Sequence, residues 1–160
     1  MRIDLTVRSV TDIDYESLLQ NGKSVFLFDF DNTINLWKSS EIPDKVLDIF
    51  EYLKSKGATV VIVSNGKPRK LNCEVQVIWR AMKPLVWKVK IKLKELLQDK
   101  EKVVVIGDQL FTDVLFGNLL GAFTIKVDPL DTRREFLSTK ILRLFERLVF
   151  KFQRKSGERC

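Results

Sequence analysis

At 160 residues the chain is long enough to fold as one domain with a substantial core, and its 45% hydrophobic and 31% charged residues are typical of a globular protein. It contains no histidine, which excludes Ser-His-Asp and Cys-His catalysis as well as zinc bound through histidine. The net charge is +7, and no apolar run approaches the roughly 20 residues that span a bilayer. With two cysteines and no recognisable signal peptide, we expect a cytoplasmic location.

The first strong strand, Val25–Phe30, is the stretch around which the chain is organised. A short helix over residues 13–19 is predicted before it, with Gly22 just past the helix end. The strand begins with four consecutive apolar residues, which indicates burial on both faces, as in a parallel sheet. Asp29 and Asp31 lie at its carboxyl end, where open α/β sheets carry their chemistry. Taken alone, the stretch is equally compatible with an ordinary turn.

A helix and a second strand complete the first β-α-β unit. Pro43 suits the first turn of a helix, apolar residues recur at helical spacing, and Gly57 ends it. Ala58–Val63 is the second buried strand, and Ser64-Asn65-Gly66 follows it. This order of elements predicts a parallel sheet.

The third strand candidate, Val75–Trp79, is shorter than the first two. The basic stretch 67–73 before it is predicted to be a loop or a short helix. After it, Pro84 is expected to open a helix that runs to about Gln98, with its lysines facing solvent.

The last two strands are Lys102–Ile106, which ends in Gly107-Asp108, and Ala122–Val127. Thr112 or Asp113 could cap the helix between them. The elements together predict an α/β fold of three layers, Rossmann-like, with a five-stranded, mainly parallel sheet and no large cap domain.

Residues 131–160 differ from the preceding core, for which we expect the bounds 1–130. Apolar residues fall on one helical stripe, and between residues 133 and 155 eight basic residues accompany two acidic ones. The pattern predicts a basic amphipathic helix, which could lie in an anionic membrane interface through residues 132–155. It could equally pack on the core or on a second subunit, so the oligomeric state stays open.

Four polar motifs follow the predicted strands or open the predicted helices, and they come in the order Asp29-x-Asp31-x-Thr33, Ser64-Asn65, Lys83-Pro84 and Gly107-Asp108-x4-Asp113. In this order and spacing, residues 10–130 resemble the haloacid dehalogenase (HAD) superfamily of phosphotransferases. More narrowly, the chain is similar to the YqeG family of HAD subclass IIIA, the short relatives of phosphatidylglycerophosphate phosphatases. The similar parts are Asp29-Phe30-Asp31-Asn32-Thr33, Met82-Lys83-Pro84, Gly107–Val114 and the Arg- and Phe-rich end. That family usually has leucine where this chain has Phe30, a change that we expect to be neutral.

Phosphate-ester hydrolysis needs a nucleophile, an acid for the leaving oxygen, and positive charge around the phosphoryl group. Because the chain has no histidine, a carboxylate is the expected nucleophile, and aspartate can form an aspartyl-phosphate. The resemblance assigns this role to Asp29, the acid–base role to Asp31, and charge neutralisation to Lys83. Neighbouring carboxylates can raise the pKa of such an acid toward neutral pH.

Mg²⁺ suits a few carboxylates together with waters and phosphate oxygens. The resemblance implies a Mg²⁺ cofactor held by the side chains of Asp29 and Asp108 and the backbone carbonyl of Asp31, with Asp113 acting directly or through water. A helix cap is a nearly equal interpretation of Asp113. The resemblance also implies phosphate binding by a further set of residues: Asn32, Thr33, Ser64, Asn65 and Lys83.

Superfamily members with small soluble substrates usually carry an inserted lid, and neither the interval from Asp31 to Pro43 nor that from Ser64 to Lys83 is long enough for one. An open site suits a phosphate on something large. We therefore expect hydrolysis of a lipid phosphate, phosphatidylglycerophosphate to phosphatidylglycerol, by a protein that is peripheral on the inner face of the membrane and has no nucleic-acid partner. Arg69 could face such a phosphate-rich surface or be an ordinary loop residue.

Two alternatives stay open. The same enzyme could act on a nucleic-acid end or a phosphoprotein, because basic charge attracts any polyanion. The chain could instead be a receiver-like or non-catalytic binding module. Against the second alternative, receiver domains place the phosphorylated aspartate after a later strand and lack an acid two residues on.

Overall fold

The computed structural model describes residues 1–36 and 38–131. Six strands form one sheet in the order β1-β6-β5-β2-β3-β4, and every neighbouring pair is parallel. The strands are β1 Leu5–Val7, β2 Val25–Phe28, β3 Thr59–Val63, β4 Gln76–Ile78, β5 Val103–Gly107 and β6 Phe123–Val127. The predicted α/β class and parallel sheet are confirmed. The strand number was wrong by one, because the edge strand β1 has only three residues and no buried apolar run.

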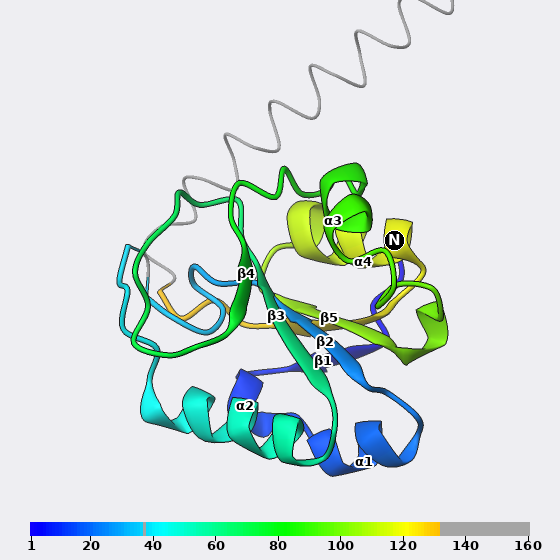
Figure 1. Cartoon of the computed structure of the whole chain (residues 1–160), viewed down its shortest axis with the longest axis horizontal. Helices are drawn as coiled ribbons and strands as arrows, with labels where there is room; N and C mark the ends of the chain where they lie inside the picture. The colour runs from blue at the N-terminus through cyan, green and yellow to red at the C-terminus, as the bar shows by residue number, and fades with distance from the viewer. Residues whose placement is uncertain (37, 132–160) are drawn as a thin grey trace, which may run out of the picture. The chain divides into compact units, whose positions relative to one another are not determined.

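The helices cover both faces of the sheet, which gives the three predicted layers (Figure 1). α1 (Tyr15–Gln20) and α2 (Asp44–Ser55) lie on one face, and α3 (Trp87–Lys92) and α4 (Leu115–Leu120) lie on the other. Short helical turns over residues 10–12, 100–102 and 110–114 connect these elements. No helix in the described part of the chain is long and apolar enough to cross a bilayer.

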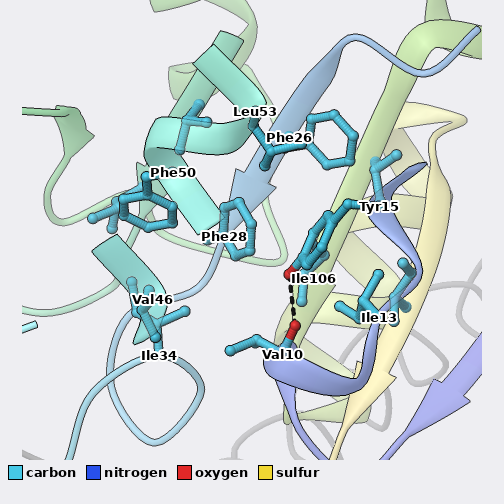
Figure 2. Close-up of a cluster of buried hydrophobic side chains, with 14 of the residues drawn as sticks. Val10, Ile13, Tyr15, Phe26, Phe28, Ile34, Val46, Phe50, Leu53 and Ile106 are labelled. Carbon is cyan, nitrogen blue, oxygen red and sulfur yellow. Dashed lines mark hydrogen bonds between the residues drawn. The ribbon is translucent and has the colours of Figure 1, made fainter. Parts of the chain in front are cut away.

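Strand β2 is buried on both faces, as its uninterrupted apolar run predicts. Phe26 and Phe28 point into the core beneath α1 and α2, where Tyr15 and Phe50 pack against them (Figure 2). Val25 and Leu27 of the same strand point into the core beneath α3 and α4. In Figure 2 the hydroxyl of Tyr15 donates to the Val10 carbonyl at 2.8 Å, so its one polar atom is satisfied. Because β2 packs on both faces, its position in the sheet is fixed, and Asp29 is held at its carboxyl end.

Two predicted helices begin elsewhere in the structure. Pro84 does not open a helix to Gln98. Instead, Leu85 donates its backbone N–H to the Met82 carbonyl in a turn, and α3 covers only Trp87–Lys92. Val89 and Leu93 are the buried residues on that side, so only a short amphipathic stretch packs on the sheet.

The predicted capping role of Thr112 or Asp113 was also wrong. Both residues lie inside a π-helical turn, Leu110–Val114, which runs directly into α4. The Asp113 carboxylate accepts the backbone N–H of Gln109 at 3.1 Å but is turned inward toward the ends of the strands. A π turn of this kind often marks a functional site.

All the strands and helices given above lie in one compact unit, Met1–Leu130. Residues 132–160, which make up all but the first residue of the predicted basic amphipathic helix and tail, lie outside the described residues, as does Trp37.

Candidate active site

The carboxyl ends of the three central strands bring the predicted motifs together. β2 lies between β5 and β3, and these strands end just before Asp29, Asp108 and Ser64 respectively. The Asp29 backbone N–H still donates to the Ile106 carbonyl of β5 at 2.8 Å, which ties the first carboxylate to the strand that carries the second. Segments almost 80 residues apart in the sequence therefore meet at one edge of the sheet.

Three carboxylates form a compact cluster at this edge. Asp29, Asp108 and Asp113 each offer an oxygen, and these oxygens all lie within 4.8 Å of one another. Asp108 and Asp113 are buried. Gly107 permits this approach, because a Cβ at that position would lie 2.3 Å from the Asp113 side chain.

Lys83 supplies the positive charge inside the cluster. Its buried Nζ donates to Asp29 Oδ1 at 2.6 Å and to Asp113 Oδ1 at 2.5 Å. Burial by itself would lower the pKa of Lys83, but the two carboxylates raise it above its ordinary value, so the side chain stays an ammonium.

The side chain of Asn65 holds the backbone of Lys83 in place. Asn65 Nδ2 donates to the Lys83 carbonyl at 3.0 Å, and the Lys83 N–H donates to Asn65 Oδ1 at 2.7 Å. The Ser64-Asn65 and Lys83-Pro84 motifs are thus one structural unit. Asn65 is predicted to bind phosphate through its backbone N–H, and its side chain has this separate positioning task.

Thr33 bridges two of the carboxylates. Its buried hydroxyl lies 3.0 Å from Asp29 Oδ2 and 3.1 Å from Asp108 Oδ1, and it accepts the Asp108 N–H at 3.1 Å. A hydroxyl has one hydrogen, so it donates to one carboxylate at a time. Thr33 is predicted to bind phosphate, and its hydroxyl is directed at the carboxylates and sets their spacing.

The carboxylates are electrostatically crowded. Burial, then repulsion from Asp113, raises the pKa of Asp29 to about 6, although Lys83 and Thr33 act in the opposite direction. Burial, then repulsion from Asp113 and Asp29, raises the pKa of Asp108 to about 7. Three carboxylates facing one ammonium leave an excess of negative charge in a nearly buried space. An oxygen-only donor set of this charge fits a hard divalent cation such as Mg²⁺.

The raised pKa values predict how the stability of the metal-free protein depends on pH. Asp29 and Asp108 still bind protons in the folded state at pH values where the unfolded chain, with ordinary values near 3.8, has lost them. Since the folded state then holds more protons, these groups make the free energy of unfolding fall as pH rises from about 4 to 7. Asp108→Asn removes one of them.

We therefore expect the free energy of unfolding in EDTA to fall less in Asp108→Asn than in the wild type between about pH 5 and pH 7.5, as measured by urea titration. Asp48→Asn, at an exposed position of α2, is the matched control and should follow the wild type. If the free energy of unfolding of Asp108→Asn fell as much as that of the wild type, or more, repulsion among the carboxylates would not destabilise the cluster.

Asp31 lies outside the carboxylate cluster and has a different partner. Its Oδ2 accepts from Arg69 Nη2 at 2.5 Å, and the Arg69 Nη1 donates to the Ser39 carbonyl at 2.9 Å. The guanidinium lies over the rings of Phe30, at 4.7 Å, and Trp79, at 5.4 Å. Arg69 is therefore an integral part of the site, because four partners fix the plane of its guanidinium.

From the sequence, Arg69 could face a phosphate-rich surface or be an ordinary loop residue, and its pairing with Asp31 was not predicted. The aromatic residues Phe30 and Trp79 could have indicated a partner for an arginine. They are far apart in the sequence, and only the fold brings them together with Arg69. Gly66 lies at the same point, since a Cβ there would be 3.0 Å from both Arg69 Nη2 and Asp31 Oδ2, and 3.1 Å from Ser64 Oγ. The Oγ of Ser64, a residue predicted to bind phosphate, accepts the Gly66 N–H at 2.9 Å.

Asn32, also predicted to bind phosphate, shapes the loop through its backbone. Its φ of 70° is left-handed, a conformation that asparagine tolerates better than most residues. Its N–H donates to the Asn35 carbonyl at 2.7 Å, and its carbonyl accepts the Leu130 N–H at 3.0 Å. The loop that carries Asp31 and Thr33 is therefore tied to the segment after β6.

Comparisons with known proteins give independent evidence on the family of the chain. Residues 7–121 match the model of a family described as haloacid dehalogenase-like hydrolase. The chain is 31% identical to "Probable phosphatase YqeG" of Bacillus subtilis (strain 168), over 96% of this chain and 92% of that protein. It is 27% identical to "Phosphatidylglycerophosphate phosphatase 1, chloroplastic/mitochondrial" of Arabidopsis thaliana, over 94% of this chain and 48% of that protein.

A solved structure shares the fold. The crystal structure of an uncharacterized protein from Listeria monocytogenes serotype 4b superposes with a TM-score of 0.51, at 15% identity, over 69% of this chain and 84% of that chain. The resemblance drawn from the four motifs is confirmed by these matches.

Proposed function

The chain belongs to the haloacid dehalogenase-like hydrolases and is a phosphatase of that family, and from this premise we propose that it is a Mg²⁺-dependent phosphomonoester hydrolase that works through an aspartyl-phosphate on Asp29 and acts on a lipid phosphate. One observation carries the catalytic part: Lys83 Nζ contacts Asp29 at 2.6 Å inside a cluster of three carboxylates. An aspartate whose oxygen contacts an ammonium at the end of the central strand is suited to act as a nucleophile.

In the first step an Asp29 oxygen attacks the phosphorus, and the bond between phosphorus and the leaving oxygen breaks. Asp31 gives its proton to that oxygen, so the alcohol leaves neutral. In the second step Asp31 takes a proton from water, the water oxygen attacks the phosphorus, and the phosphorus–Asp29 bond breaks to release phosphate. Ser64 and the Asn65 N–H would hold a phosphoryl oxygen, and Lys83 would offset the charge that develops on it.

The donor set Asp29, Asp108 and Asp113 would hold the Mg²⁺ ion. When bound, this ion supplies positive charge that lets a phosphate dianion approach the carboxylates. Thr33 would keep two of these carboxylates at their spacing through its hydroxyl. Asp113 contacts Lys83 directly, so it would hold the ammonium as well as face the ion.

The proposal of a lipid substrate rests on two further observations. One relative is named as a phosphatase of phosphatidylglycerophosphate, although this chain covers only 48% of its length. In addition, 11 residues separate Asp31 from Pro43 and 18 separate Ser64 from Lys83, intervals too short for an inserted lid domain. A site without such a lid suits a phosphate presented on a surface.

The test is phosphate release by the full chain from three substrates: phosphatidylglycerophosphate in vesicles, a 3′-phosphorylated oligonucleotide and a phosphopeptide. We expect release from the lipid, in Mg²⁺ and not in EDTA. Faster release from the oligonucleotide or the peptide would contradict the lipid assignment and favour the alternative substrate class. Release that is unchanged in EDTA would contradict the metal requirement.

A further inference from the structure

Large apolar side chains are exposed in one segment, residues 80–94, beside the site. Met82 is 50% exposed, Leu85 51%, Trp87 53% and Ile91 71%. Trp87 and Ile91 are one helical turn apart on α3 and therefore share a face. Val89 and Leu93 are buried against the sheet, so this exposed face is a second apolar face of the segment, which packing on the core does not explain.

The same segment is strongly basic. No acidic residue occurs from residue 75 to residue 94, whereas six residues there are basic. Lys83 is buried in the site, Lys88 is half-buried, and the other four are exposed: Arg80, Lys90, Lys92 and Lys94. Because exposed apolar side chains alternate with lysines and no acidic residue lies among them, the segment forms a surface that is both apolar and basic.

The segment is anchored to the site at its beginning. The Ala81 N–H donates to the Ser64 carbonyl at 2.9 Å, and the Arg80 N–H donates to the Gly66 carbonyl at 3.0 Å. Lys88 Nζ reaches back to the carbonyls of Trp79 and Arg80, which ties α3 to the end of β4. Figure 1 shows the segment passing from the end of β4 to α3. Whatever binds residues 82–91 therefore lies next to Lys83.

We propose that residues 80–94 form a docking surface for an anionic lipid bilayer, with Leu85, Trp87 and Ile91 entering the interface. Tryptophan favours the boundary between headgroups and acyl chains, aliphatic side chains gain by burial there, and lysines attract anionic headgroups. A second copy of the chain would bring the same four exposed cations against one another. A nucleic acid would satisfy the lysines but leave Leu85 and Ile91 in water. The choice of a lipid rests on the proposed function, and the exposure and charge of the surface do not.

Depth measurement at single positions tests the surface without any turnover. A nitroxide is attached to full-length Ile91→Cys, with Cys73 and Cys160 replaced by serine. Its matched control is Glu51→Cys, at an exposed position of α2 on the opposite face of the sheet. The vesicles are phosphatidylcholine with about 30% phosphatidylglycerol, an anionic content that attracts lysines. We expect these vesicles to shield the nitroxide at position 91 from a water-soluble relaxation agent, and to leave the nitroxide at position 51 as it is in buffer.

An activity comparison separates failure of this surface from failure of the proposed function. Trp87→Ser/Ile91→Ser should lower the hydrolysis of vesicle-borne phosphatidylglycerophosphate about tenfold, since two interfacial side chains are lost. It should leave the hydrolysis of soluble p-nitrophenyl phosphate unchanged. If the wild type hydrolyses the lipid while position 91 stays in water, the surface is wrong and the function stands. If position 91 is shielded while no lipid phosphate is released, the surface stands and the substrate is wrong.

Discussion

Replacing Asp29 by asparagine is expected to reduce the steady-state release of phosphate about 10³-fold or more, because the amide cannot form the acyl phosphate. Asparagine has the shape of aspartate and can still accept from Thr33, and Lys83 keeps its contact with Asp113 at 2.5 Å. The variant should therefore fold. In EDTA its free energy of unfolding should not fall below that of the wild type, since one of three crowded carboxylates has been neutralised.

The measurement is phosphate release from p-nitrophenyl phosphate with saturating Mg²⁺, together with urea unfolding of the same preparations. Asp48→Asn, on the solvent side of α2, is the matched control for loss of one carboxylate and should keep wild-type activity. A folded Asp29→Asn protein with intact activity would contradict the assignment of the nucleophile, whichever substrate is used.

Replacing Asp31 by asparagine should produce a loss that depends on the leaving group. An alkyl phosphate needs a proton for its leaving oxygen, so we expect a loss of about 10²- to 10⁴-fold. p-Nitrophenolate leaves without a proton, so the first turnover should survive. Because the second step also uses Asp31, the variant should release about one equivalent of p-nitrophenol in a burst and then nearly stop.

Arg69→Gln should change the reaction in the same direction as Asp31→Asn, by a smaller factor. The substitution keeps the Asp31 carboxyl group but removes the guanidinium that holds it at 2.5 Å. Arg69→Lys keeps the charge without the two-pronged geometry, and so should recover only part of the alkyl phosphate activity. Lys70→Gln, at the exposed neighbouring position, should have no effect. If Asp31→Asn released no burst of p-nitrophenol, so that the first turnover was lost on both substrates, the result would contradict the role of Asp31 as the acid.

The sequence predicted best the parts of the fold that are buried on both faces. β2, β3 and β5 are continuous apolar runs ending in polar motifs, and the fold places Asp29, Ser64 and Asp108 at their carboxyl ends. Every residue of β2 is buried, and a run of apolar residues this continuous is stable only in such a buried strand. The edge strand β1 was missed because half-buried residues carry no such pattern.

The helices that begin near the site were predicted less well, because the site itself determines their starts. Asp113 looks like a helix cap in the sequence, but its carboxylate contacts Lys83, 30 residues earlier in the chain. The residues after Pro84 suit a long helix by composition, but only Val89 and Leu93 of the stretch Trp87–Leu93 fit against the sheet. In both places tertiary contacts outweigh local preference.

The site was predicted as a set of residues, whereas its internal contacts were not. The motif order indicated that Lys83 and Asp29 belong together, and the fold places them 2.6 Å apart. The clamp of Asn65 on the Lys83 backbone and the pairing of Arg69 with Asp31 depend on loop conformations that no spacing rule describes.

Chemical trapping of the phosphoryl group tests the aspartyl-phosphate mechanism most directly. The Asp31→Asn variant is mixed with p-nitrophenyl phosphate and Mg²⁺, quenched after the burst, reduced with borohydride and analysed by peptide mass spectrometry. Borohydride converts an aspartyl-phosphate to homoserine, and we expect homoserine at position 29. A burst of p-nitrophenol with no homoserine at position 29, or with the modification at another residue, would contradict the mechanism.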